Sequence, residues 1–173
     1  MTDAGRARLQ IGAEGALVGI VLGVVLGLLW WLLTPAVKWT ITADGSVVPA
    51  DIGHDDWFAA DGWFLVLGLL LGLALTALLW FRGRSQPVAL AVSVAVGAAL
   101  LSLTGWAVGG VLGPPDPTSL VDTVPAGVTA TMDGALSLRA PGVLLAPVVA
   151  ALGLLGMLLG SAAVATGPPP PSG

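Results

Sequence analysis

Cysteine, tyrosine and asparagine are all missing from this chain of 173 residues. Without cysteine the chain has no disulfide, no thiolate metal ligand and no cysteine nucleophile. Without asparagine it has no acceptor for N-linked glycosylation. Covalent cross-links, thiolate chemistry and N-glycans therefore play no part in its structure or function.

Charge is also scarce. Charged residues make up 9% of the chain, against about 25% in an ordinary soluble domain. Hydrophobic residues make up 56%, and the mean hydropathy is +0.97. Much of the surface must therefore face something other than water. The net charge of −4 comes mainly from acidic loops, and no basic patch is present that would suit a nucleic-acid partner.

Four long apolar runs dominate what is present. They cover residues 15–37, 62–81, 88–112 and 142–166, and none contains a charged residue. A run of about 20 apolar residues crosses the hydrocarbon core as a helix, because the backbone must satisfy its own hydrogen bonds in lipid. The sequence predicts an all-α membrane protein built as a four-transmembrane-helix bundle. A single membrane domain would cover 12–166, between an N-terminal stub at 1–11 and a Pro-rich tail at 167–173.

The alternative interpretation of the first apolar run is a secretory signal peptide, because the basic residues Arg6 and Arg8 precede it. The run is longer than the apolar region of such a signal, which has about 7–15 residues, and no small-residue cleavage site follows it. We therefore expect this segment to stay as the first span.

The basic residues predict the orientation. Arg6, Arg8, Arg82 and Arg84 would share one side of the membrane, and only Lys38 and Arg139 would lie on the other. Positive residues concentrate on the cytoplasmic side. We expect a multi-pass protein of the plasma membrane, with both termini in the cytoplasm and with loops 38–61 and 113–141 outside.

Capping residues refine the expected helix ends. Asp61 is a candidate N-cap for the second helix, and Pro87 and Pro141 suit the first turns of the third and fourth helices. Pro147 would lie inside the fourth helix and kink it. Several tryptophans, Trp30 among them, would gather at the outer membrane boundary, where amphipathic rings are favoured.

Both outer loops have the pattern of a β-hairpin that turns at Asp-Gly. Alternating residues flank Asp44-Gly45 at 39–48 and Asp133-Gly134 at 128–138. Because both hairpins would emerge from the same face of the bundle, we expect them to pair into a small extracytoplasmic cap sheet.

Glycines four residues apart recur in every expected span. Such spacing lines one helix face with small residues and lets two backbones approach closely. These candidate packing residues are Gly19, Gly23, Gly27, Gly68, Gly72, Gly105, Gly109, Gly156 and Gly160. They serve either packing within the bundle, which we favour, or an oligomer face, most readily on the first helix.

Candidate chemistry is sparse. His54 stands among Asp51, Asp55 and Asp56, a set able to bind a divalent metal, but the spacing fits no established site and a solvated acidic loop is the simpler interpretation. Asp61 either caps its helix or pairs with Arg139. The expected spans contain no ionisable residue, and their few hydroxyls commonly bond to their own helix.

Three segments carry a resemblance to a known family. They are Thr42-Ala43-Asp44-Gly45, Ala60-Asp61-Gly62-Trp63-Phe64 and Leu138-Arg139-Ala140-Pro141-Gly142-Val143-Leu144-Leu145. Together with the four-helix frame they resemble an actinobacterial family of small integral membrane proteins catalogued as a domain of unknown function. The resemblance implies topology and source, and it carries over no functional residue.

We expect a protein that is not an enzyme, with no cofactor and no small-molecule substrate. Its expected role is that of an accessory or scaffold subunit in the bacterial cell envelope, in contact with the lipid bilayer and with another membrane protein or itself. The alternative is a small transporter or channel component that acts as an oligomer.

Overall fold

Four long helices and a small sheet make up the computed structural model of the chain, which describes residues 3–34, 37–42, 46–49, 54–113, 129–132 and 140–165, and residues 44, 125 and 138. The helices are α1 (Asp3–Leu33), α2 (His54–Gly83), α3 (Pro87–Leu112) and α4 (Ala146–Ala165), and the 3₁₀ turn η2 (Pro141–Leu145) leads into α4. In this part of the chain four segments are long and apolar enough to cross a membrane, namely Gln10–Leu33, Ala59–Gly83, Pro87–Leu112 and Pro141–Ala162. The predicted four-helix membrane fold is confirmed.

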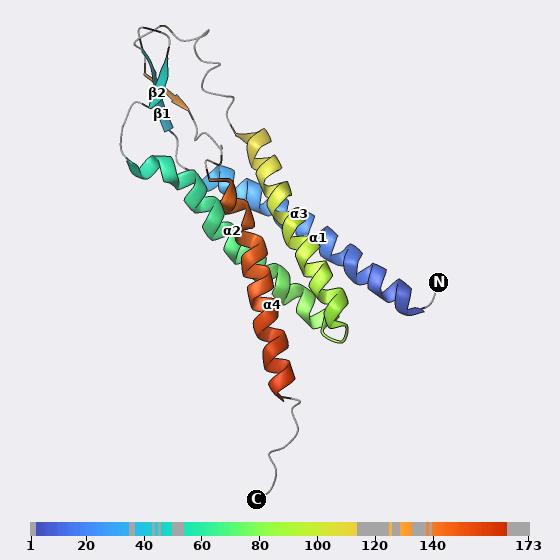
Figure 1. The fold of residues 1–173 in the computed structure, drawn as a ribbon. Helices are drawn as coiled ribbons and strands as arrows, with labels where there is room; N and C mark the ends of the chain where they lie inside the picture. The colour runs from blue at the N-terminus through green and yellow to red at the C-terminus, as the bar shows by residue number, and fades with distance from the viewer. Residues whose placement is uncertain are drawn as a thin grey trace, which may run out of the picture.

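The helices form two side-by-side pairs. α1 packs mainly on α3, and α2 packs mainly on α4. Figure 1 shows the α2–α3 turn at the end of the bundle opposite the sheet. Both pairs are parallel, since α1 and α3 run away from that turn whereas α2 and α4 run toward it. Many large apolar side chains stay exposed around the bundle, among them Leu17, Val111 and Met157. Lipid accepts such a surface, whereas water would oppose it.

The described strands form one antiparallel sheet at the end of the bundle where α1 ends and η2 begins (Figure 1). β1 (Val37–Ile41) lies between β2 (Val47–Pro49) and β3 (Thr129–Met132). Trp39 is opposite Pro49 on one side and opposite Ala130 on the other. The first hairpin and its pairing with a strand of the second outer loop are therefore as predicted. The second Asp-Gly turn, at 133–134, lies outside the described residues.

Two helices begin well before the positions that the sequence predicts. α1 begins at Asp3, within the expected stub, and α2 begins at His54, eight positions before the expected start at Gly62. The added turns carry polar and charged residues. A helix can continue in this way because its ends extend past the hydrocarbon core into water. The expectation that Asp61 caps its own helix is wrong, since Asp61 lies well inside α2.

The fourth span also begins differently. The helix type changes directly before Pro147, from the 3₁₀ turn η2 to α4 at Ala146, and the kink itself stays a prediction. Pro147 is therefore the second residue of α4, where a missing N–H leaves no hydrogen bond unmade. The irregular part of the span lies before the proline and not at it.

Candidate functional site

The glycines of α1 bring its backbone into close contact with α3. A Cβ added at Gly23 would lie 2.6 Å from Cβ of Thr104 and 2.7 Å from the main-chain oxygen of Leu101. At Gly19 it would meet the backbone of Gly97, and at Gly27 it would lie 2.8 Å from the main-chain oxygen of Gly105. Real Cβ atoms do not come this close, so the two backbones can approach only because these positions are glycine. We call this contact the α1–α3 seam.

The glycines of α3 complete the seam by accommodating bulky side chains of α1. A Cβ at Gly105 would clash with Leu26, and one at Gly109 would clash with the ring of Trp30. Trp30 is fully buried there, donates from Nε1 to the main-chain oxygen of Ala60 at 2.7 Å, and meets Phe64 edge-to-face at 5.0 Å. Trp30 therefore joins α1, α2 and α3. The free space over Gly109 admits the ring into the bundle. Trp30 stands three residues before the end of the Gln10–Leu33 span, and its place at the membrane boundary stays a prediction.

The second helix pair uses a glycine face in a different way. Gly68 and Gly72 of α2 both lie against Pro147 at the start of α4. At Gly68 an added Cβ would lie 3.1 Å from the proline ring, and at Gly72 it would meet the proline backbone. The proline of α4 thus fits into the depression that the two glycines leave on α2.

The remaining predicted packing residues are not brought against another helix. Gly156 and Gly160 of α4 are exposed, and a Cβ at either would meet nothing within 4 Å. Gly153 on the same helix is likewise open. The glycine motif of α4 therefore differs from the other three, since it presents small residues outward.

Three buried hydroxyls link the helices across the bundle. Ser93 of α3 donates to the main-chain oxygen of Ile11 in α1 at 2.7 Å, and Ser102 donates to that of Leu144 in η2 at 2.6 Å. Thr76 of α2 lies 2.9 Å from the main-chain oxygen of Ala151 in α4 and 3.3 Å from that of Gly72 in its own helix. The expectation that these hydroxyls bond to their own helix holds in part for Thr76 and is wrong for Ser93 and Ser102.

Asp61 joins α2 to the start of the fourth span. Its side chain is buried, and Oδ2 accepts a hydrogen bond from the main-chain N–H of Ala140 at 3.1 Å. Ala140 is the N-cap residue of η2 and has no capping side chain of its own. Asp61 thus supplies from α2 the acceptor for the N-cap N–H that the third helical residue supplies in a capping box. The proposed pairing of Asp61 with Arg139 involves a residue outside the described part of the chain.

The described residues of the β1–β2 turn form a small polar cluster. In the β1–β2 turn Asp44 accepts from Ser46 Oγ at 3.1 Å and from the N–H of Ser46 at 3.3 Å, and its Oδ1 lies at hydrogen-bond distance from Thr42 Oγ1. The Thr42 hydroxyl, followed by the Ser46 N–H and hydroxyl, lowers the pKa of the Asp44 carboxyl. These bonds favour the charged carboxylate and hold the exposed turn in its hairpin conformation.

The metal hypothesis for His54 concerns residues that are described only in part. His54, Asp55 and Asp56 form the first turn of α2, and Asp51 lies outside the described residues. Among the side chains that the structure does describe, no three His, Asp or Glu residues gather into a possible metal site. The His54 hypothesis therefore stays a prediction.

Sequence reasoning missed two seam residues. A Cβ added at Gly15 would clash with Ser93, and one added at Gly97 would lie 2.6 Å from the main-chain oxygen of Gly15. Gly15 stands four residues before Gly19, so the same spacing extended by one turn would have found it. Gly97 stands eight residues before Gly105 with Leu101 between them, and a search for adjacent glycine pairs overlooks that spacing.

The fold and its contacts define the class of this chain: it is a multi-pass integral membrane protein with four candidate spans in its described part. No protein-family model matches the chain, and neither a curated protein nor a solved structure matches it. Its function must therefore be inferred from its own residues and their contacts.

Proposed function

We propose that this protein is a non-enzymatic accessory or scaffold subunit of a bacterial cell envelope. In this proposal it resides in the plasma membrane with both termini and the α2–α3 turn in the cytoplasm. The excess of arginine at Arg6, Arg8, Arg82 and Arg84 supports that orientation. The resemblance of its motifs to an actinobacterial four-helix family supports the source.

One observation carries the structural role. The buried polar side chains of the described chain are Asp61, Thr76, Ser93 and Ser102, and each bonds to the main chain of a different helix or of the segment that begins η2. A membrane enzyme needs a convergent pair of titratable groups, and a transporter needs polar groups that face a cavity near mid-membrane. Here the polar groups hold helices together, which supports a scaffold over either alternative.

The exposed face of α4 supports assembly with another membrane protein. Gly153, Gly156 and Gly160 leave this face flat, with Leu152 and Met157 exposed beside them. In lipid, helices associate through close backbone contact at small residues, since apolar burial gains little there. A partner's helix can approach α4 on this face as closely as α3 approaches α1.

The proposal is tested by affinity purification in mild detergent followed by quantitative mass spectrometry. Gly156→Leu fills the open face of α4 without an intramolecular clash, and Gly110→Leu is its matched control on α3, where an added Cβ also meets nothing within 4 Å. We expect the parent and Gly110→Leu to retain one membrane protein at a fixed ratio. We expect Gly156→Leu to lose most of that protein while keeping the parental melting temperature.

The alternative function gives a different result in the same experiment. A small transporter or channel component would purify as a homo-oligomer without another subunit and would carry ion or solute flux in proteoliposomes. Such flux, abolished by Gly156→Leu and kept by Gly110→Leu, would replace the scaffold proposal with the transport function.

A further inference from the structure

The α1–α3 seam opens at the end of the bundle that holds the α2–α3 turn. At Gly15 an added Cβ would clash with Ser93, but at Gly12, less than one turn earlier, it would meet nothing within 4 Å. A cavity of about 580 Å³ lies there between the start of α1 and the start of α3. Its volume falls within the range of about 300–1,000 Å³ that is usual for small-molecule sites. We call it the seam groove.

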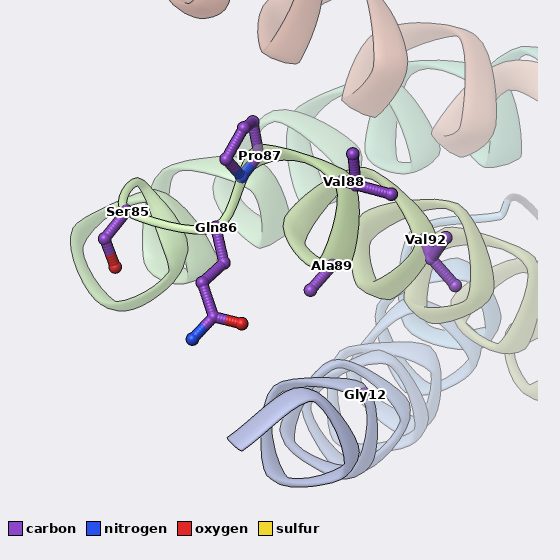
Figure 2. A pocket seen from close by; sticks show the side chains of 7 residues that line it. All are labelled: Gly12, Ser85, Gln86, Pro87, Val88, Ala89 and Val92. Atoms are coloured by element: carbon purple, nitrogen blue, oxygen red, sulfur yellow. The ribbon is translucent and has the colours of Figure 1, made fainter. Parts of the chain in front are cut away.

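The lining of the seam groove is polar at one end and apolar along the rest of its length. Ser85 and Gln86 of the α2–α3 turn line the end nearest water, and Pro87, Val88, Ala89 and Val92 line the part that continues along α3. Figure 2 shows Gln86 and Ala89 pointing toward α1, where Gly12 forms the opposite wall. Val88 and Val92 are largely exposed. A polar mouth above an apolar channel matches a lipid, which has a polar headgroup above an acyl chain.

The charge around the groove is positive. Arg84 directly precedes the lining residue Ser85 and is exposed, as is Arg82. On the opposite wall Arg8 precedes Gly12 by four residues in α1, which is about one helical turn. Four arginines at this end of the bundle outnumber the two acidic residues, Asp3 and Glu14. A headgroup that carries negative charge fits this end of the bundle better than a neutral one.

We propose that the seam groove binds one anionic phospholipid from the leaflet that faces the α2–α3 turn. The phosphate lies at the polar mouth beside Arg84, and one acyl chain lies along Val88 and Val92 in the space left by Gly12. The lipid thereby fills the gap that remains where α1 leaves α3. This inference needs only that the bundle spans a membrane, so it stands or falls separately from the scaffold role.

The test measures lipid adducts on the purified protein by native mass spectrometry. Phosphatidylglycerol and phosphatidylcholine with identical acyl chains are added in turn. Gly12→Leu fills the groove, and its control is Gly110→Leu on α3, since an added Cβ is unobstructed at both positions. Arg84→Gln removes one charge at the mouth, and its control is Arg139→Gln, one residue before Ala140 in the sequence.

We expect one phosphatidylglycerol to bind the parent more tightly than phosphatidylcholine. Gly12→Leu should lose this adduct, and Gly110→Leu should keep it. Arg84→Gln should bind phosphatidylglycerol about fivefold more weakly with phosphatidylcholine unchanged, the effect of one basic residue near an anionic surface. An unchanged adduct in Gly12→Leu, or no preference between the two lipids, would overturn the proposal. Displacement of the lipid by millimolar inorganic phosphate would also overturn it, because a headgroup-only anion site requires no acyl channel.

Discussion

At the scale of single residues, glycine provides the helix–helix packing here that leucine provides in the core of a soluble protein. Lipid tails are as apolar as leucine, so a leucine between two helices gains little over one that faces lipid. At Gly19 and Gly97 two helix backbones touch because neither position carries a side chain. The cohesion of the α1–α3 seam therefore depends on the absence of Cβ atoms.

A leucine in place of Gly23 tests this directly. The added atoms would be forced against Thr104 and the Leu101 carbonyl, and neither can move without shifting α3. We expect Gly23→Leu to destabilise the protein by about 1–3 kcal/mol, as overpacking of a tight contact does. The measurement is thermal unfolding in detergent, followed by circular dichroism.

The adjacent residue provides the control. Val24 is 38% exposed on the outer side of α1, so Val24→Leu should melt like the parent. If Gly23→Leu also melts like the parent, α1 does not pack on α3 through this face, and the glycines reflect only the composition of the chain.

Elements are joined in this bundle by side chains that bond to the main chain of a neighbour. The bond from Ser93 joins α3 to α1, the bond from Thr76 joins α2 to α4, and Asp61 joins α2 to the start of η2. Hydrogen bonds between helices in lipid contribute only about 0.6 kcal/mol on average, because the unfolded state in the membrane also finds partners for these groups. Their main effect is on geometry, since each bond fixes the position of one helix along the axis of its neighbour.

Removal of the Asp61 carboxylate should loosen the start of the fourth span. Asp61→Ala leaves the Ala140 N–H without its acceptor, and loss of an N-cap acceptor costs about 0.5–2 kcal/mol. We expect faster amide hydrogen exchange across residues 140–145, with little change in α3. Mass spectrometry of the exchanged peptides gives the readout.

Asp61→Asn separates this hydrogen bond from the charge of Asp61. The amide oxygen of asparagine still accepts from the Ala140 N–H, so residues 140–145 should exchange nearly as slowly as in the parent. Equal exchange in Asp61→Ala and the parent would show that the bond does not hold η2 in place.

The whole molecule has two unlike ends. The sheet of β1, β2 and β3 caps one end, and the α2–α3 turn with the seam groove forms the other (Figure 1). Acidic residues dominate loops 38–61 and 113–141, and arginines dominate the end with the turn. The end of the bundle with the sheet is therefore more negative than the end with the α2–α3 turn, along the axis that would cross the membrane.

Cysteine labelling in intact cells tests the direction of this polarity. The chain has no cysteine of its own, so each introduced thiol is unique. Ser46 lies exposed in the β1–β2 turn and Ser85 lies exposed in the α2–α3 turn. We expect an impermeant thiol reagent to label Ser46→Cys at once and Ser85→Cys only after the membrane is opened. The reverse order of labelling would place both termini outside the cell.

The sequence by itself determined the features that depend on one segment at a time. Span number follows from run length, because a helix of about 20 apolar residues is the solution that lipid allows for such a run. The β1–β2 hairpin follows from alternation around Asp44, and the first turn of α3 follows from Pro87. Each of these signals is local, and the membrane removes most of the competing conformations.

Only the tertiary structure decided which faces meet. Gly23 and Gly156 stand in the same spacing motif, yet one lies in the seam and the other is open. Trp30 and Trp31 are neighbours, yet Trp30 is fully buried and Trp31 is 41% exposed. Asp61 has the local appearance of a cap for its own helix but caps the start of another. In a membrane helix, apolar residues face both lipid and the neighbouring helices. The sequence pattern of one helix therefore does not indicate which face packs or on which helix. That choice depends on how the helix surfaces fit together when the bundle forms.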